Sequence, residues 1–343
     1  SLVSAIMQKV SNKPIKTFTI GSKDNLYDES RYASKISRHL GTEHHELILD
    51  SNDAIDVIPD LCNIYDEPFA DSSQLPTLMV SKFAKQHVSV ALTGDAGDEV
   101  YCGYNRYLLG QSLVNRLSHV PNGLLNIAQS ALTSISPHLY NKMAAVMAKL
   151  IPKLKKYKRI GDNIHKFARI INFKDEADLY SKLILTWPET ATTSEIIDIA
   201  TDISAAFNSQ QLSLAERMMW QDAIGYLQND ILTKIDRASM AVSLETRVPF
   251  LDNDVYQHAW SLPLAFKLHK GITKYPLRKI ISQYIPDHIM SKPKAGFGIP
   301  IGELMRNRLL EYSHSMIFND DILQLGFIQK NGLEKIWNDH QNK

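Results

Sequence analysis

The sequence predicts an α/β protein that begins with a parallel sheet and continues into a large, mainly helical part. Apolar runs of strand length alternate with helical runs as far as residue 110, which is typical of parallel sheets. Beyond that residue, segments with apolar side chains at helical spacing follow one another with few strand-like runs. We therefore expect two parts, residues 1–110 and residues 111–343.

The first part opens with a strand, a helix and a second strand. Strand-like runs stand at residues 16–21 (KTFTIG), 45–50 (HELILD) and 87–92 (HVSVAL). Helical spacing predicts helices at residues 28–40, 52–65 and 74–85. Gly41 follows the first of these helices, where a glycine commonly ends one. The third strand-like run is apolar enough to predict a strand that is buried in a parallel sheet.

The second part consists of predicted helices. They include residues 124–134, 140–150, 175–185 and 213–227. The most basic stretch of the chain, residues 149–170, precedes the last two of them. Because no series of aromatic side chains and no RNA-binding motif accompanies it, we interpret this stretch as a solvated helix face and expect no nucleic-acid partner.

Composition excludes several classes of protein. The 38 lysines and arginines balance 37 acidic residues, so the net charge of +1 provides no general attraction to nucleic acid or anionic membranes. No apolar stretch approaches the roughly 20 residues of a membrane-spanning helix. The two cysteines, Cys62 and Cys102, lack metal-ligand spacing. We expect a cytoplasmic protein without a disulfide scaffold, a zinc site or a membrane partner.

The turn after the third strand-like run carries the strongest chemical signal. Thr93 and Gly94 provide small residues where backbone N–H groups can approach a ligand, and Asp95, Asp98 and Glu99 add three carboxylates. Ligands of parallel sheets bind beyond the carboxyl ends of the strands. A single aspartate would indicate a helix cap, but three acids exceed what capping requires. The turn therefore predicts a site for a metal ion and a phosphate.

Two further segments are candidates for substrate contact. Asp71 and Ser73 lie in YDEPFADSS, a polar loop that follows a predicted helix. Lys234, Asp236 and Arg237 place three charges in an otherwise apolar helical run. These charges either face a substrate cleft or form an ion network on the helix surface.

Three long strings resemble the synthetase half of the glutamine-dependent asparagine synthetases, in the order of that family and along nearly the whole chain. They are LTGDAGDEVYCGYNRY (residues 92–107), LTKIDRASMAVSLETRVPFLD (residues 232–252), and KYPLRKII with SKPKAGFGIP (residues 274–281 and 291–300). Several strings in one order are more specific than a short motif. The resemblance implies a parallel sheet of the adenine-nucleotide α-hydrolase, or ATP-pyrophosphatase, type.

The resemblance also implies a reaction and its residues. Aspartate attacks the α-phosphorus of ATP, giving aspartyl-adenylate and pyrophosphate, and ammonia then displaces AMP to give asparagine. ATP and Mg²⁺ are the implied cofactors, since this chemistry needs positive charge beside the phosphates. The residues implied to bind ATP are Ile20, which meets adenine, Thr93, Gly94 and Asp98, which also holds the metal. Lys294 is implied to steady the departing charge, and Asp95 to act as a base toward ammonia.

The chain departs from the family pattern in several places. The family's phosphate loop, SGGxDSS, and the strand before it are absent, with Ser1 at the position of the last serine. The glutaminase half, which would release ammonia from glutamine, is absent as well. Asp95 stands where asparagine synthetases often carry glutamate, and the chain stops at WNDHQNK, where members usually continue. We therefore expect a fragment that is truncated at both ends and is inactive alone.

Two alternatives to an asparagine synthetase stay open. The shorter carboxylate of Asp95 leaves room for an amidotransferase that acts on another carboxylate, such as a uronic acid in polysaccharide synthesis. The other alternative is a non-catalytic relative that keeps the site for nucleotide binding or for assembly with a partner. The retention of Asp98 and Lys294 argues against this second alternative. A homodimer is the candidate assembly.

Overall fold

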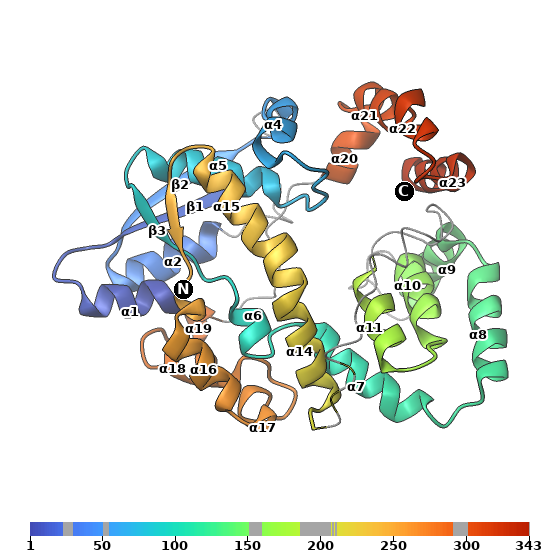
Figure 1. The fold of residues 1–343 in the computed structure, drawn as a ribbon, viewed down its shortest axis with the longest axis horizontal. Coiled ribbons are helices and arrows are strands. Elements are labelled where there is room, and N and C mark those ends of the chain that lie inside the picture. Colours follow the sequence, from blue (N-terminus) through green and yellow to red (C-terminus); the bar gives the residue numbers. More distant parts are fainter. Residues whose placement is uncertain are drawn as a thin grey trace. The chain divides into compact units, whose positions relative to one another are not determined.

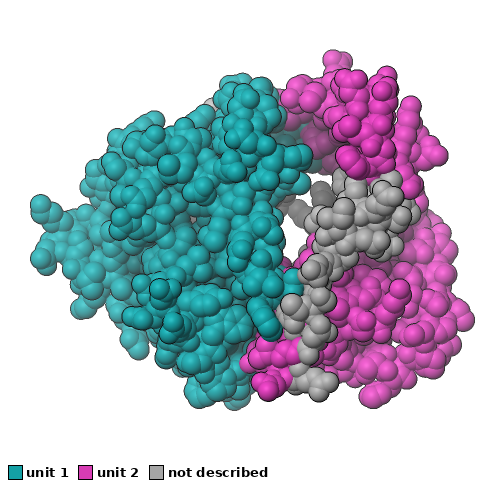
Figure 2. Space-filling model, viewed as in Figure 1, with its two compact units in different colours: residues 1–104, 219–304 teal, residues 105–218, 305–343 magenta. Residues whose placement is uncertain are grey.

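The computed structural model describes residues 1–22, 30–50, 55–150, 160–185, 207, 209, 211–290 and 301–342 (Figure 1). Its contacts separate two compact units, coloured in Figure 2. Unit 1 comprises residues 1–104 and 219–304, and unit 2 comprises residues 105–218 and 305–343. Each unit thus draws on two stretches of chain, whereas the sequence analysis divides the chain once. The predicted division into residues 1–110 and residues 111–343 stays a prediction.

A parallel strand pair in unit 1 confirms the predicted strand–helix–strand unit. β1 (Lys16–Ser22) leads through α2 (Ser30–Leu40) to β2 (Glu43–Leu49). The two strands run parallel and pair along their whole length. Gly41 ends α2 with a φ of 71°, in the left-handed region that favours glycine.

The second strand pair joins segments that are far apart in the sequence. β3 (Val90–Leu92) pairs in parallel with β4 (Glu245–Arg247). The expectation of a buried strand over residues 87–92 is wrong, because Val90 and Leu92 are 42% and 41% exposed. Among the described strands β4 is the only neighbour of β3, so one edge of β3 has no strand beside it. The described strands form two small parallel sheets in place of a single larger one.

The main core of unit 1 lies between the first sheet and two helices. α5 (Gln74–Lys85), a predicted helix, packs on β1 and on α15 (Thr233–Met240). The buried residues of this cluster are Ile20, Leu49, Val57, Leu75, Leu78, Met79 and Ala238. Leu78 is fully buried, and the burial of one such side chain contributes about 1.5–3 kcal/mol. The cluster fixes α5 against α15.

Smaller clusters hold the other helices of unit 1. One contains Ala96, Val100, Tyr101, Leu227 and Ala259, and it includes α6 (Gly97–Val100) and α16 (Asn253–Ser261). Another contains Ala5, Ile281 and Ile285, and it joins α1 (Leu2–Val10) to α18 (Tyr275–Ile281). The remaining elements are η1 (Ile58–Asp60), α4 (Leu61–Tyr65), the π-helix η4 (Leu227–Leu232), η5 (Pro249–Leu251), α17 (Leu264–Lys267), α19 (Asp287–Met290) and α20 (Ile301–Arg306), whose last residues belong to unit 2.

Unit 2 is mainly helical in its described part. Its helices are α7 (Asn105–Leu117), α8 (Asn122–Ser134), α9 (Pro137–Leu150), α10 (Ile160–Ile171), α11 (Glu176–Ile184), α21 (Leu310–Ile317), α22 (Asp320–Gln324) and α23 (Lys330–Gln341), and α14 (Leu214–Ile224) begins in it. α10 packs against α8 and α9. The predicted helices at residues 124–134, 140–150 and 175–185 are confirmed. Within the described residues, no helix has the length and apolar character that crossing a membrane requires.

Candidate functional site

The acidic turn follows β3, and packing holds its backbone. The N–H of Thr93 donates to the carbonyl of Arg247 at 2.9 Å, which ties the end of β3 to the end of β4. Gly94 is exposed, and nothing lies within 4 Å of the position that a Cβ would take, so its backbone is open to a ligand. Ala96 adopts a φ of 64°, at a cost of roughly 1–2 kcal/mol, and is buried in the cluster around α6.

Asp98 pairs with a lysine that the sequence analysis does not select. Its carboxylate lies 2.9 Å from Nζ of Lys274, and the two side chains are 26% and 27% exposed. Lys274 directly precedes α18 and adopts a φ of 52°. KYPLRKII contains this lysine, but no local pattern reveals a contact with so distant a residue. The pair brings one negative and one positive charge, both accessible, to the candidate phosphate site.

Gly103 makes room for this pair. Its N–H donates to the carbonyl of Asp98 at 2.7 Å. A Cβ on Gly103 would lie 2.7 Å from Cα of Asp98 and closer still to the Asp98 carboxylate and the Lys274 side chain. We therefore expect Gly103→Ala to lower the free energy of unfolding by about 1–3 kcal/mol, because the ion pair must shift.

Urea unfolding measures this effect. Gly123→Ala on α8 is the control, because a Cβ there meets nothing within 4 Å, and it should not destabilise the protein. Equal stability of the two variants would show that the backbone at Gly103 yields without loss.

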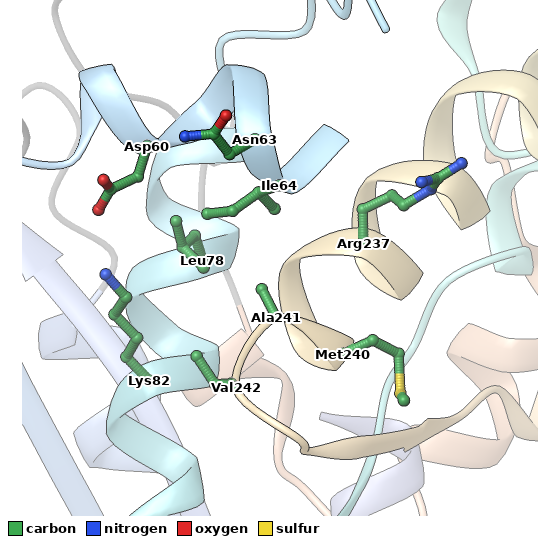
Figure 3. Close-up of a pocket in the computed structure, with 9 residues that line it drawn as sticks. All are labelled: Asp60, Asn63, Ile64, Leu78, Lys82, Arg237, Met240, Ala241 and Val242. Atoms are coloured by element: carbon green, nitrogen blue, oxygen red, sulfur yellow. The ribbon is translucent and has the colours of Figure 1, made fainter. Parts of the chain in front are cut away.

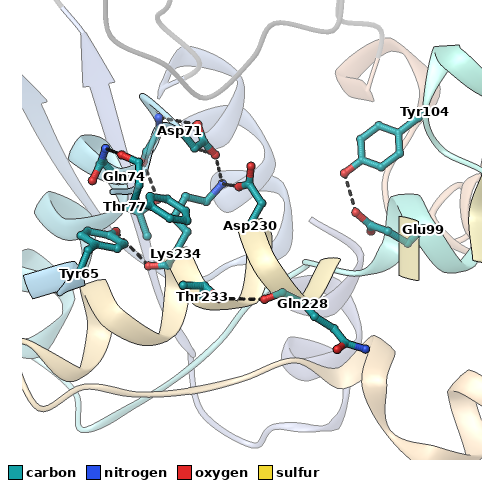
Figure 4. Close-up of polar contacts among 12 residues, drawn as sticks. Tyr65, Asp71, Gln74, Thr77, Glu99, Tyr104, Gln228, Asp230, Thr233 and Lys234 are labelled. Atoms are coloured by element: carbon teal, nitrogen blue, oxygen red, sulfur yellow. Dashed lines mark hydrogen bonds and ion pairs between the residues drawn. The ribbon is translucent and has the colours of Figure 1, made fainter. Parts of the chain in front are cut away.

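A second charged network joins three segments of unit 1 (Figure 4). Nζ of Lys234 on α15 lies 2.6 Å from Oδ2 of Asp71 and 3.9 Å from Oδ1 of Asp230. The backbone N–H and the hydroxyl of Ser73 also donate to Asp71, at 2.8 and 2.7 Å. Tyr65 donates its hydroxyl to the carbonyl of Lys234 at 3.1 Å. The predicted substrate residues Asp71, Ser73 and Lys234 therefore lie together.

The two carboxylates of this network differ in acidity. Burial works against the ionised form of Asp71, but the hydrogen bonds from Lys234 and Ser73 outweigh it, and the pKa of Asp71 is lowered. Burial, reinforced by the charge of Asp71, raises the pKa of Asp230 to about 6. At 3.9 Å, Lys234 is too far away to donate a hydrogen bond to Asp230, which explains the difference.

The sequence analysis does not select Asp230, because this residue lies in a segment of irregular helix. Helical spacing predicts one helix over residues 213–227, but α14 ends at Ile224 and the π-helix η4 follows. π-helical segments are rare and often occur at functional sites. The only signal in the sequence is an aspartate four positions before Lys234 in a predicted helical region.

The raised pKa of Asp230 predicts a pH dependence of stability. The folded protein holds this proton more tightly than the unfolded chain, whose pKa is close to 3.8, so the stabilising contribution is complete below that pH and is lost as pH rises through about 6. We expect the stability of the wild type, relative to Asp230→Asn, to fall between pH 4 and pH 7. Urea unfolding of both proteins across this range is the measurement, and a constant difference would contradict the assignment.

Asp95 is influenced by both charged groups. Burial raises the pKa of the Asp95 carboxyl, the positive charge of Lys234 lowers it, and the negative charge of Asp98 raises it. One charge of the Lys234 network and one charge of the Asp98–Lys274 pair therefore act on the same carboxyl. A carboxyl with a raised pKa holds a proton more readily than a free aspartate does, which suits a group that accepts a proton.

Glu99 supports the turn from inside the protein. Its side chain is 1% exposed and accepts a hydrogen bond from the hydroxyl of Tyr104 at 2.6 Å (Figure 4). Burial raises the pKa of Glu99, and the charges of Asp98 and Asp222 raise it further. Asp95 and Asp98 remain partly exposed, so two of the three acids of the turn are accessible and the third is buried.

The remaining predicted site residues make none of the contacts of the charged network that the structure describes. The side chain of Ile20 is 8% exposed and belongs to the main core cluster. Asp236 is exposed on α15, and the guanidinium of Arg237 pairs with Asp66 at 3.5 Å. Lys294 lies outside the described residues. The expected roles of these residues stay predictions.

The described residues fit a magnesium ion only in part. We find no group of three or more His, Cys, Asp or Glu side chains among them that could hold a metal ion. Mg²⁺ is usually bound through one or two carboxylates, with water and substrate phosphates completing its shell. Asp98, partly exposed at the turn, can supply one such carboxylate. As far as the described residues go, the site fits an ion that arrives with a nucleotide.

A family model matches this chain along its whole length, and known relatives match most of it. The sequence model of the asparagine synthase family matches residues 1–343, which confirms the resemblance. Asparagine synthetase [glutamine-hydrolyzing] 1 of Bacillus subtilis is 28% identical over 303 residues, or 88% of this chain and 45% of the relative. Asparagine synthetase [glutamine-hydrolyzing] 3 of the same organism is 22% identical over 309 residues, or 87% and 42%. The chain spans less than half of the length of these relatives.

Proposed function

Since the chain belongs to the asparagine synthase family, we propose that it is the ATP-dependent, amide-forming part of a longer enzyme. The observation that supports this most is the Asp98–Lys274 pair, 2.9 Å apart, beside a carboxyl at Asp95 whose pKa is raised. Aspartate is the first proposed substrate, because the relatives are named as asparagine synthetases.

The proposed first step joins the substrate to AMP. A carboxylate oxygen of aspartate attacks the α-phosphorus of ATP, the bond to the bridging oxygen breaks, and pyrophosphate leaves. Two anions must approach each other, so nearby positive charge lowers the barrier. Lys274 and Lys234 are the described lysines that supply it, with Lys294 proposed to steady the pyrophosphate. The residues proposed to line the nucleotide are Ile20, Thr93 and Gly94.

Asp98 is the proposed protein ligand of Mg²⁺. When bound, the ion neutralises part of the phosphate charge. The ion pair with Lys274 keeps the Asp98 carboxylate in place at the turn, where Gly103 leaves room for both side chains.

The proposed second step forms the amide. Ammonia attacks the carbonyl carbon of the adenylate, AMP leaves, and one proton must depart from the new nitrogen. Asp95 is proposed to accept this proton. The proposed substrate contacts are Asp71, Ser73, Lys234 and Asp236. Ammonia would come from a glutaminase domain of the longer protein, and the inactivity of the present chain alone stays a prediction.

Replacement of Asp95 tests this function. In the longer protein, we expect Asp95→Asn to keep much of its AMP formation and to lose about a hundredfold or more in amide formation, because the base is removed while the phosphate site stays. AMP and asparagine are measured side by side, with ammonia as the nitrogen source. Asp254→Asn is the control, an exposed aspartate on α16 that should leave both products unchanged.

The same assay separates the alternatives. Unchanged asparagine formation by Asp95→Asn would reduce Asp95 to a structural residue. If the wild-type protein amidates a uronic acid and makes no asparagine, a uronic acid replaces aspartate as the proposed substrate. A folded wild type that releases no AMP with any carboxylate would favour the non-catalytic relative.

A further inference from the structure

A pocket of about 570 Å³ lies in unit 1 beside the second half of α15 (Figure 3). The described residues that line it are Asp60, Asn63, Ile64, Leu78, Lys82, Arg237, Met240, Ala241 and Val242. They come from the end of η1 and the middle of α4, from the middle of α5, and from the second half of α15 with the turn after it. Its volume is within the usual range for sites that bind small organic molecules.

The floor of the pocket is apolar and firmly held. Leu78 is fully buried in the main core cluster, and Ile64 and Val242 pack against that cluster. Figure 3 shows these side chains between the polar groups at the two ends of the pocket. A ligand would therefore meet a preformed aliphatic surface.

The polar groups of the pocket are weakly engaged. The guanidinium of Arg237 lies 3.5 Å from Asp66, and these side chains are 41% and 75% exposed, so the pair contributes little. Lys82 and Asp60 are exposed at the opposite end of the pocket from Arg237, and the side chain of neither makes a hydrogen bond or ion pair with another described residue. Two cations against one carboxylate leave the lining with a net positive charge.

We propose that this pocket binds a small carboxylate with an aliphatic chain, with the carboxylate on Arg237 and the chain on Ile64, Leu78 and Val242. Arginine is well suited to carboxylates because two parallel N–H groups of its guanidinium can donate to the two carboxylate oxygens. Lys82 and Asp60 would contact a polar group at the far end of the ligand. The proposal goes beyond amide formation, and it gives Arg237 a ligand other than the proposed substrate.

Calorimetric titration of the full-length protein tests the proposal, with 4-methylpentanoate as the probe. We expect saturable binding, and binding of the uncharged 4-methylpentanamide that is at least about tenfold weaker, because the charge-assisted hydrogen bonds are lost. Acetate, which lacks the chain, should bind more weakly than the probe. Equal affinity for the acid and the amide would overturn the proposal.

Variants and competition locate the site. Arg237→Gln should weaken probe binding at least about tenfold, and Lys82→Gln should weaken it less, because Lys82 lies at the far end. Lys9→Gln, which removes an exposed lysine on α1, should leave the affinity unchanged. Saturating aspartate should not displace the probe. Displacement by aspartate, or unchanged affinity in Arg237→Gln, would overturn the assignment, and this outcome is independent of whether AMP is formed in the amide assay.

Discussion

Lys234→Met is expected to lower the free energy of unfolding by about 3–5 kcal/mol. The substitution keeps the aliphatic stem but removes the charge from a side chain that is 10% exposed. Asp71, which now accepts a hydrogen bond of 2.6 Å from Lys234, would be left as a half-buried anion. Breaking a buried pair from one side has this large effect because the remaining charge loses its partner.

A double-mutant cycle separates the pair from simple loss of packing. Asp71→Asn alone removes the anion, and in the double variant Asp71→Asn should recover part of the loss caused by Lys234→Met. Urea unfolding of the four proteins gives the coupling energy between the two residues, which we expect to exceed about 1 kcal/mol. Strictly additive losses would show that the two side chains do not depend on each other.

The order of elements at the start of the chain could be predicted because its signals are local. Strand-length apolar runs and helical spacing are properties of neighbouring residues, and β1, α2, β2 and α5 all form where these signals stand. The burial of β3 could not be predicted in the same way. Burial depends on which strands lie beside it, and the described partner, β4, comes from a segment late in the chain.

The residues of the candidate site also differ in whether the local sequence could predict them. Asp71, Ser73 and Lys234 stand out as polar residues in their own segments, and the structure brings them together. Lys274 and Asp230 become visible only through contacts made by distant segments. Lys274 meets Asp98 because it directly precedes α18, whose Leu277 packs against the cluster around α6. Asp230 reaches the network through a π-helix. Residue type can thus identify candidate site residues, whereas the residues that they contact are known only from the fold.

Asp98→Asn, in the longer protein, is expected to reduce AMP and pyrophosphate formation about a thousandfold while the protein stays folded. The substitution keeps the shape of the side chain and removes the proposed ligand of Mg²⁺, so the charge of the phosphates is no longer neutralised in the first step. Stability should change by less than about 1 kcal/mol, because the pair with Lys274 is partly exposed. A large loss of rate with a small loss of stability is the result that distinguishes a site residue from a structural one.

The matched variant Lys274→Met removes the other half of the pair. If Lys274 acts on the phosphates, this variant should also lose pyrophosphate release, and its KM for ATP should rise. If Lys274 only positions Asp98, the variant should mainly change the dependence of pyrophosphate release on Mg²⁺ concentration. Pyrophosphate release, thermal unfolding and a magnesium titration of both variants separate these cases, with Asp254→Asn as the exposed control. Wild-type release of pyrophosphate by folded Asp98→Asn would remove Asp98 from the site, and with it the main support for ATP chemistry at this turn.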